Sequence, residues 1–332
     1  MDVVIAEVTR GDRVESAHAG AAVVLDADGG TVLALGDADA PVYPRSAVKA
    51  LQTLPMVESG VPERLGLTES EIALTCASHT GEPRHVETAR SMLRKTGRDE
   101  TCLECGTHWP SDAAAARALA AAGEAPGAVH NNCSGKHSGF ICLACDRGLD
   151  PAGYVKPDHP AMREVTAALA AMTGARLDEA NRATDGCSIP TYAVPLRSLA
   201  FAFARFGAER GLPPYRAKAA ARIRAAVTAD PFLASGTGRF DNQLMTAMGT
   251  RVFNKGGAEG VQCACIPELG LGIAVKSRDG AGRAAQVAMA ALIARLLPDA
   301  AGNEALTRLR EPLLTNWNGT AVGAMRAGAA LS

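Results

Sequence analysis

Residues 22–35, AVVLDADGGTVLAL, consist of two apolar runs separated by the polar, glycine-containing stretch 26–30. This pattern is typical of two antiparallel strands joined by a tight turn. It returns near the other end of the chain in residues 261–275, VQCACIPELGLGIAV, where the turn falls at 267–270. Because a two-stranded hairpin is only marginally stable by itself, we expect the two hairpins to share one antiparallel sheet.

The long segment between the hairpins is dominated by Ala, Leu, Arg and Glu at helical spacing. The pattern predicts helices at about 47–59, 84–96, 111–122, 136–147, 159–172, 213–228 and 283–297. We therefore expect an α+β fold in which helices cover an antiparallel sheet built from both chain ends, while the helical middle forms a second lobe. A single two-lobed domain over 1–332 is expected, with the sheet lobe at about 1–60 and 250–332 and the helical lobe at about 61–249.

Composition excludes several classes of protein. The 332 residues include 34 Lys and Arg against 35 Asp and Glu, which argues against a nucleic-acid partner. Hydrophobic residues make up 47% of the chain, as expected of a compact protein, and no apolar run is long enough to span a membrane. The odd number of cysteines, nine, cannot all pair, so we expect reduced thiols and a cytoplasmic location.

Ser46 and Lys49 form an S-x-x-K motif at the start of the helix expected at 47–59. Residues three apart share a helix face, so the hydroxyl and the amine can meet, and a neutral lysine can activate a serine nucleophile. The motif alone is common, and a helix-capping role for Ser46 is the alternative. Lys255 adds a second cation, and the two glycines after it allow close approach to the backbone. An S-x-x-K followed much later by a K-[TS]-G-like strand is the order found in serine β-lactamase-type folds.

Two polar stretches, residues 130–140 and 184–190, are poor core material and are predicted to be loops that lead into helices and carry function. The S-D-N element of serine β-lactamase-type folds is missing, and its nearest candidate is residues 76–82, where Ser78 is followed by His79 rather than Asp. An ordinary cap or turn remains the alternative for Ser78. His79 and His85 have no evident partners in the sequence and are predicted to be surface or loop histidines.

Two C-x-x-C pairs, 102–105 and 142–145, raise the alternative of a structural zinc site. Their separation is longer than such sites usually have, and the second pair lies in a stretch predicted to be helical. We therefore interpret these cysteines as core thiols.

Six stretches taken together resemble the bacterial L-asparaginase II family of Ser–Lys asparaginases, which is similar in fold to serine-dependent glutaminases and serine β-lactamases. They are PRSAVKALQTLPMVESG (44–60), CASHTGEPRHVE (76–87), CGTHWP (105–110), HNNCSGKHSGF (130–140), DGCSIPTYAVPL (185–196) and KGGAEG (255–260).

The resemblance implies two serine–lysine pairs. Ser46 corresponds to the nucleophile and Lys49 to its base, while Ser78 and Lys255 correspond to a second pair beside the first. Which of the two serines carries the acyl group is left open.

The resemblance also implies a zinc site and a substrate pocket. The zinc site corresponds to Cys133, Lys136 and Cys187, although a lysine amine is an unusual zinc ligand and pocket-lining thiols are the alternative. The pocket residues are Arg45, His137 and Asp185. A guanidinium suits the α-carboxylate of an amino acid, and a carboxylate suits its α-ammonium.

The implied activity is hydrolysis of L-asparagine to L-aspartate and ammonia through an acyl-enzyme, in a homodimer. The alternatives are a related amidohydrolase acting on glutamine or a β-lactam, and a non-catalytic zinc-binding protein that retains the motifs.

Overall fold

The computed structural model describes residues 1–331 and divides into two compact units. One unit comprises 1–47, 193–211 and 243–332, and the other comprises 48–192 and 212–242. Residues 193–211 therefore group with the sheet, although the predicted boundaries placed them in the helical lobe. Residues 48–60, expected with the sheet, group with the helices.

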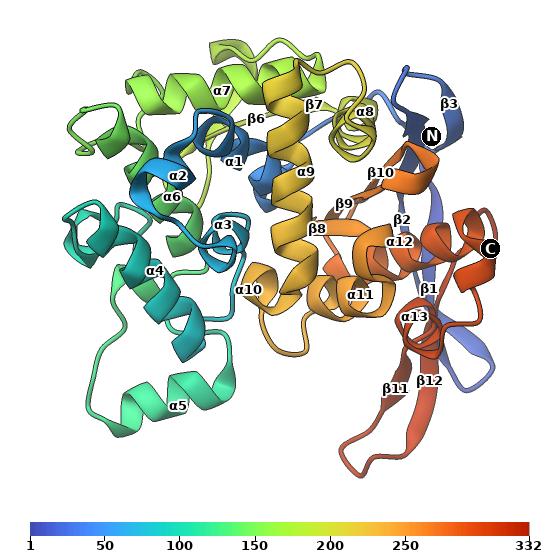
Figure 1. The fold of residues 1–332 in the computed structure, drawn as a ribbon. Coiled ribbons are helices and arrows are strands. Elements are labelled where there is room, and N and C mark those ends of the chain that lie inside the picture. Colours follow the sequence, from blue (N-terminus) through green and yellow to red (C-terminus); the bar gives the residue numbers. More distant parts are fainter. Residues whose placement is uncertain (332) are drawn as a thin grey trace. The chain divides into compact units, whose positions relative to one another are not determined.

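The first unit is built on one antiparallel sheet in the order β11-β12-β1-β2-β10-β9-β8, with β3 paired to β2 (Figure 1). The strands are β1 Val3–Arg10, β2 Arg13–Asp26, β3 Thr31–Leu35, β8 Phe253–Gly257, β9 Val261–Ile266, β10 Leu271–Ser277, β11 Leu313–Thr315 and β12 Ala321–Ala327. Both predicted hairpins are present, and β2 pairs with β10 so that Val24 lies opposite Ile273. The expected sheet from both chain ends is confirmed.

Helices cover this sheet on both faces. All six residues of β9 are buried, and because alternate residues of a strand point to opposite faces, neither face can be open to solvent. The helix α8 Leu196–Ala208 contacts β2, β9 and β10, while α12 Gly282–Leu296 contacts β1, β9, β10 and β12. The packing against α8 is close: a Cβ at Gly272 would lie 2.0 Å from the Ala200 carbonyl oxygen.

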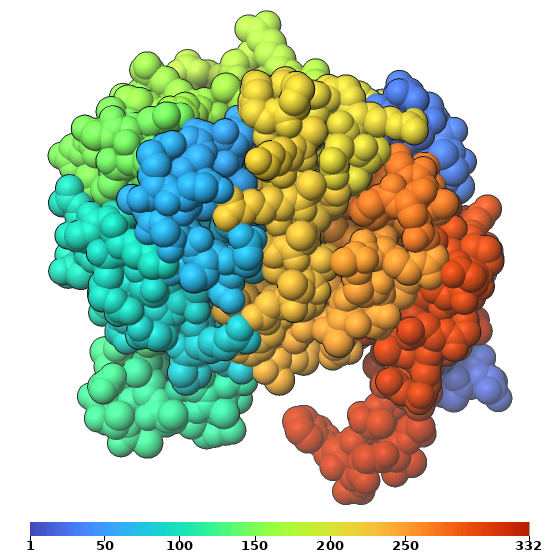
Figure 2. Space-filling model, in the orientation of Figure 1, coloured from blue at the N-terminus to red at the C-terminus, as the bar shows by residue number. Residues whose placement is uncertain are grey.

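Shorter elements complete the first unit. They are β4 Pro41–Val42, β7 Val194–Pro195 and α13 Glu304–Arg310, with most of α11 Phe240–Met248. The β11–β12 hairpin projects from the rest of this unit (Figures 1 and 2), and its Trp317 is fully exposed.

The second unit is helical. It contains α1 Lys49–Glu58, α2 Val61–Leu65, α3 Glu69–Thr75, α4 Pro83–Lys95, α5 Ala113–Ala121, α6 Ser134–Asp146, α7 Pro160–Thr173, α9 Pro214–Ala229 and α10 Pro231–Ser235, with the short strands β5 Arg182–Thr184 and β6 Pro190–Tyr192. The helix α1 is buried at nine positions and contacts α6, α7 and α9. All seven predicted helices are present in the two units with ends within two residues of the prediction. Across residues 1–331, no helix combines the length and hydropathy needed to cross a membrane.

Candidate active site

Lys49 is the first residue of α1, and its ammonium group is buried in the helical unit. Its Nζ donates hydrogen bonds to Ser78 Oγ at 3.0 Å, to Cys133 Sγ at 3.1 Å and to the carbonyl oxygen of Ala77. Three donors thus meet three acceptors, which fixes the side chain. The structure therefore brings together one lysine and one serine of the two pairs that the resemblance implied, in the combination Lys49 with Ser78.

Ser78 lies in the turn that follows α3. Its backbone N–H donates to the Ala234 carbonyl oxygen at 3.1 Å, and the next N–H, of His79, donates to the Asn132 carbonyl oxygen at 3.1 Å. These bonds tie the turn to α10 and to the loop before α6. The turn is therefore held from two sides, and Ser78 Oγ is presented to Lys49 in a fixed position.

His79 and His85 are fully buried, so neither is a surface histidine. His79 lies in the loop after α3, as predicted, whereas His85 lies in α4, where the prediction is wrong. The rings stack on each other with centroids 5.0 Å apart, and His85 stacks on Phe232 at 4.4 Å. His79 Nδ1 accepts a hydrogen bond from the Gly81 N–H, so its Nε2–H donates to Ser134 Oγ at 2.9 Å. Burial lowers the pKa of both imidazoles, so they are neutral and serve as packed side chains in this part of the helical unit.

Cys133, Lys136 and Cys187 form a second cluster in the same unit. Lys136 Nζ donates to Cys187 Sγ at 3.0 Å. A hydrogen bond from Cys187, aided by the charges of Lys49 and Lys136, lowers the pKa of Cys133, and the same hydrogen bond raises the pKa of Cys187. Although burial opposes it, the neighbouring Cys133 raises the pKa of Lys136. The cluster is an ammonium group held by a thiol and a thiolate.

The donor set of this cluster suits zinc in part. Thiolates are preferred zinc ligands, whereas a lysine must first lose its proton, which Lys136 holds firmly in this cluster. Within the described part of the chain, no three His, Cys, Asp or Glu side chains are grouped as metal ligands. A zinc ion would therefore find two residues of conventional ligand type, Cys133 and Cys187, and would need to displace a proton from Cys187 and another from Lys136.

His137 and Asp185 lie near this cluster in the fold of the helical unit. His137, on α6, is fully buried, and its Nδ1 lies 2.6 Å from the hydroxyl of Tyr154. Burial lowers the pKa of His137, so the ring is neutral. Asp185 begins a turn in which its Oδ1 accepts the N–H of Cys187 at 3.3 Å. Tyr154 carries no motif in the sequence, and sequence reasoning missed it.

The sheet unit holds the remaining candidates, Arg45, Ser46 and Lys255. Ser46 lies on a short 3-10 turn, Arg45–Val48, that runs directly into α1. Lys255 lies on β8 opposite Cys263 and is 1% exposed. A Cβ at Gly257 would lie 2.5 Å from the Pro44 carbonyl oxygen, so the end of β8 contacts the Ser46 turn directly. The second glycine after Lys255 is what permits this approach.

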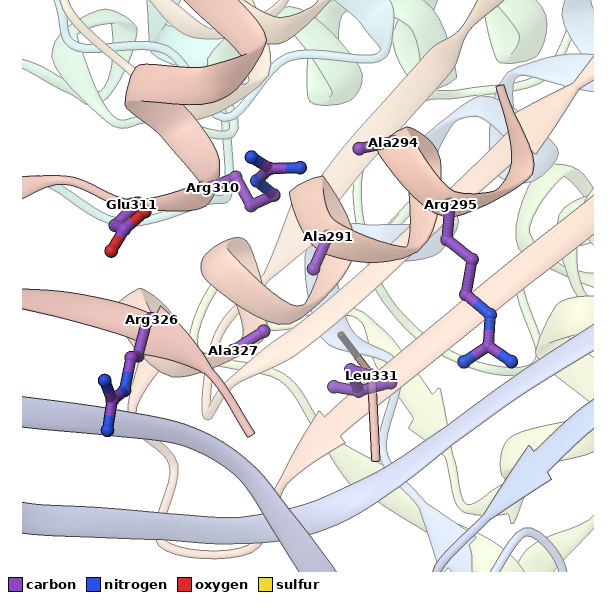
Figure 3. A pocket seen from close by; sticks show the side chains of 8 residues that line it. All are labelled: Ala291, Ala294, Arg295, Arg310, Glu311, Arg326, Ala327 and Leu331. Carbon is purple, nitrogen blue, oxygen red and sulfur yellow. The ribbon is translucent and has the colours of Figure 1, made fainter. Parts of the chain in front are cut away.

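The sheet unit also contains a cavity of about 440 Å³ beside α12, α13 and β12 (Figure 3). Arg295, Arg310 and Arg326 are among the side chains around it. None of the candidate catalytic residues lines this cavity, so it is not part of the candidate active site.

Among the cysteines of the C-x-x-C pairs, Cys105 and Cys142 are buried, as predicted for core thiols. Cys102 and Cys145 are half-buried, so their assignment to the core is wrong. All four are free thiols.

Comparison with known proteins identifies the family of the chain. Residues 6–327 match the profile of the L-asparaginase II family. The chain therefore belongs to this family.

Similar solved structures include crystal structures of Mglu. The native form is 14% identical, with a TM-score of 0.37 over 84% of this chain and 63% of that chain. The form with tris and glutamate is 15% identical, with a TM-score of 0.38 over 90% of this chain and 63% of that chain. The chain thus spans less than two thirds of the length of these proteins. No curated protein matches the chain.

Proposed function

We propose that the protein hydrolyses the side-chain amide of L-asparagine to L-aspartate and ammonia. The observation that carries the proposal is the buried contact between Lys49 Nζ and Ser78 Oγ at 3.0 Å, in a chain of the L-asparaginase II family. A buried lysine that touches a serine hydroxyl is the means by which a Ser–Lys enzyme moves a proton.

In the proposed first step, Lys49 has released one of its three ammonium protons to solvent, and Ser46 Oγ attacks the side-chain carbonyl carbon while this neutral amine accepts the serine proton. The carbonyl double bond opens to a tetrahedral oxyanion. When it collapses, the C–N bond breaks and the nitrogen leaves as ammonia, carrying the proton returned by Lys49. Ser78 touches Lys49 Nζ, which supports a role for its hydroxyl in passing that proton.

The product of this step is an ester of Ser46 with the β-carboxyl of aspartate. Water then attacks the ester carbon, the serine regains its proton, and L-aspartate leaves. Lys255 is proposed to support Ser78 as the cation of the second pair. Arg45 is proposed to bind the α-carboxylate, Asp185 the α-ammonium, and His137 an oxygen of the substrate.

An ammonia-release assay tests the activity. Purified protein is offered L-asparagine, L-glutamine and a chromogenic β-lactam, with Ser46→Ala and Ser78→Ala as variants. Turnover of asparagine that is lost in Ser46→Ala supports the proposal. If the protein instead prefers glutamine or the β-lactam, it is the related amidohydrolase named above. If it turns over none of the three compounds but binds zinc, it is the non-catalytic zinc-binding protein.

Mass spectrometry of the enzyme quenched during turnover identifies the nucleophile. An aspartyl adduct on the peptide that contains Ser46 supports the mechanism above. An adduct on the peptide that contains Ser78 would show that Ser78, and not Ser46, is the nucleophile.

We further propose that Cys133, Lys136 and Cys187 hold a zinc ion when zinc is supplied. The ion would keep the two thiolates and the lysine ordered, and no step above depends on it. Zinc titration followed by calorimetry, with Cys187→Ser as the variant, measures this binding. A homodimer and a cytoplasmic location are likewise proposals, to be checked by light scattering and by cell fractionation.

A further inference from the structure

Tyr154 is a fully buried residue whose hydroxyl makes two hydrogen bonds. It accepts the backbone N–H of Glu104 at 2.9 Å and lies 2.6 Å from Nδ1 of His137. The His137 ring is also fixed by packing, edge-on to Tyr154 at 5.3 Å and tilted against Phe140 at 5.9 Å. The ring therefore has one orientation. The neutral ring can still carry its proton on either Nδ1 or Nε2.

The hydrogen-bond partners of His137 and Tyr154 determine which ring nitrogen carries the proton. If His137 carried its proton on Nδ1, it would donate to Tyr154, and two buried groups would be left unsatisfied: the Tyr154 O–H and the His137 Nε2 lone pair. If Tyr154 donates to Nδ1 instead, only the Nε2–H lacks a partner within residues 1–331. A buried polar group without a hydrogen bond is costly, so the second arrangement is favoured.

We propose that Tyr154 is a positioning residue that holds His137 in the Nε2–H tautomer, and that this N–H is a donor reserved for an oxygen of the bound amino-acid substrate. The second half rests on the proposed function. The first half concerns the ligand-free protein and stands independently of any activity.

The arrangement gives the lone donor a clear chemical preference. An N–H that is buried and unpaired gains most from an acceptor that arrives with the ligand, and a carboxylate or amide oxygen is such an acceptor. A ligand group that offers only donors would leave the N–H unsatisfied. The tautomer therefore selects for the oxygen-bearing end of an amino acid over its ammonium end.

Nitrogen NMR of protein labelled with ¹⁵N-histidine tests the tautomer directly, with His137→Gln used to assign the resonances. The expected spectrum of the ligand-free protein shows His137 Nδ1 as the unprotonated nitrogen and Nε2 as the protonated one. The reverse assignment overturns the proposal. In Tyr154→Phe the preference for one tautomer is expected to weaken, whereas Tyr192→Phe, which removes another buried tyrosine hydroxyl of the same unit, leaves it unchanged.

Addition of L-aspartate, the proposed product, tests the donor role. The His137 Nε2–H resonance is expected to shift as the N–H enters a hydrogen bond, and an unmoved resonance at saturating L-aspartate and L-asparagine overturns that role. If the resonance shifts while the protein releases no ammonia from asparagine, the proposed function fails and the inference about recognition stands.

Kinetics of isosteric variants separate positioning from structural support. In His137→Gln the amide nitrogen takes the place of Nε2, whereas in His137→Asn the amide takes the place of Nδ1. We expect KM for asparagine to rise about tenfold more in His137→Asn than in His137→Gln, the fold-change expected of one lost hydrogen bond. Equal KM values in the two variants overturn the proposal, and this comparison holds even if Tyr154→Phe does not fold.

Discussion

Lys49 Nζ and Ser78 Oγ lie 3.0 Å apart, joining the first residue of α1 to the turn after α3. The two residues are separated by 29 positions in the sequence. Cys133 Sγ contacts the same ammonium group, so one lysine organises three segments of the helical unit.

Replacement of Lys49 by Met is expected to lower kcat for asparagine by about 10²- to 10⁴-fold, because the proposed proton acceptor is lost. The matched control is Lys218→Met on the exposed face of α9, where activity is expected to be unchanged. Steady-state ammonia release measures both. Full activity in Lys49→Met would rule out the proposed base.

Because two histidines are buried in the neutral form, we expect the free energy of unfolding to fall in mild acid. Burial lowers the pKa of His79 and His85 in the folded protein, whereas both titrate near 6.5 in the unfolded chain. The contribution of the two neutral histidines to the free energy of unfolding is therefore fully present above pH 6.5. As the pH falls below that value, the unfolded chain takes up protons that the folded protein does not. Each histidine then lowers the free energy of unfolding by up to about 1.4 kcal/mol per pH unit.

Urea unfolding between pH 5 and 7 measures this slope. His85→Gln is expected to reduce the slope by the share of one histidine. An identical slope in wild type and His85→Gln contradicts the assignment.

Gly272→Ala is expected to destabilise the sheet unit by about 1–3 kcal/mol or to prevent folding, because the new Cβ would lie 2.0 Å from the Ala200 carbonyl oxygen. Gly282→Ala places the same methyl group in open space at the start of α12 and should leave stability unchanged or slightly raised. Denaturant unfolding of the two variants compares them. Equal stabilities would mean that α8 does not pack on β10 as closely as described.

The ion pair between Glu58 of α1 and Arg216 of α9 is expected to stabilise the helical unit. Two hydrogen bonds of 2.7 and 2.8 Å join the groups, and each side chain is only 13% exposed. Glu58→Gln should therefore cost about 1–3 kcal/mol of unfolding free energy.

Glu304→Gln is the matched control for this pair, because Glu304 and Arg308 form an exposed pair on α13. Such pairs contribute about 1 kcal/mol or less. Similar losses in the two variants, measured by thermal or urea unfolding, would contradict the role given to the buried pair.

The sequence was sufficient to predict the shared sheet and seven helices, because apolar periodicity reports directly on which face is buried. It did not predict α8, whose phenylalanine-rich stretch LAFAFARF (199–206) has a composition suited to either a helix or a strand. The β11–β12 hairpin was also missed, although Asn318-Gly319 between two short strands is a known turn signal.

The candidate site was likewise predicted only in part from the sequence. Motifs were enough to nominate Lys49, Ser78 and Cys133, but not to predict that one ammonium group joins them, because the contacts are between distant positions. The burial of His79 and His85 was not predicted because the two rings stack on each other and His85 stacks on Phe232, which lies far along the chain on α10. Tyr154 was missed because nothing in the sequence around a lone tyrosine indicates a partner for its hydroxyl.

The pairing of β2 with β10 sets the order in which the sheet can be completed. On the ribosome β1, β2 and β3 emerge well before β10 and β12, their neighbours in the sheet. Until then the nascent chain presents strand edges with unpaired N–H and C=O groups, which favour association with other chains. Efficient production of this protein should therefore depend on protection of these early strands during synthesis, and slower translation would lengthen their exposure.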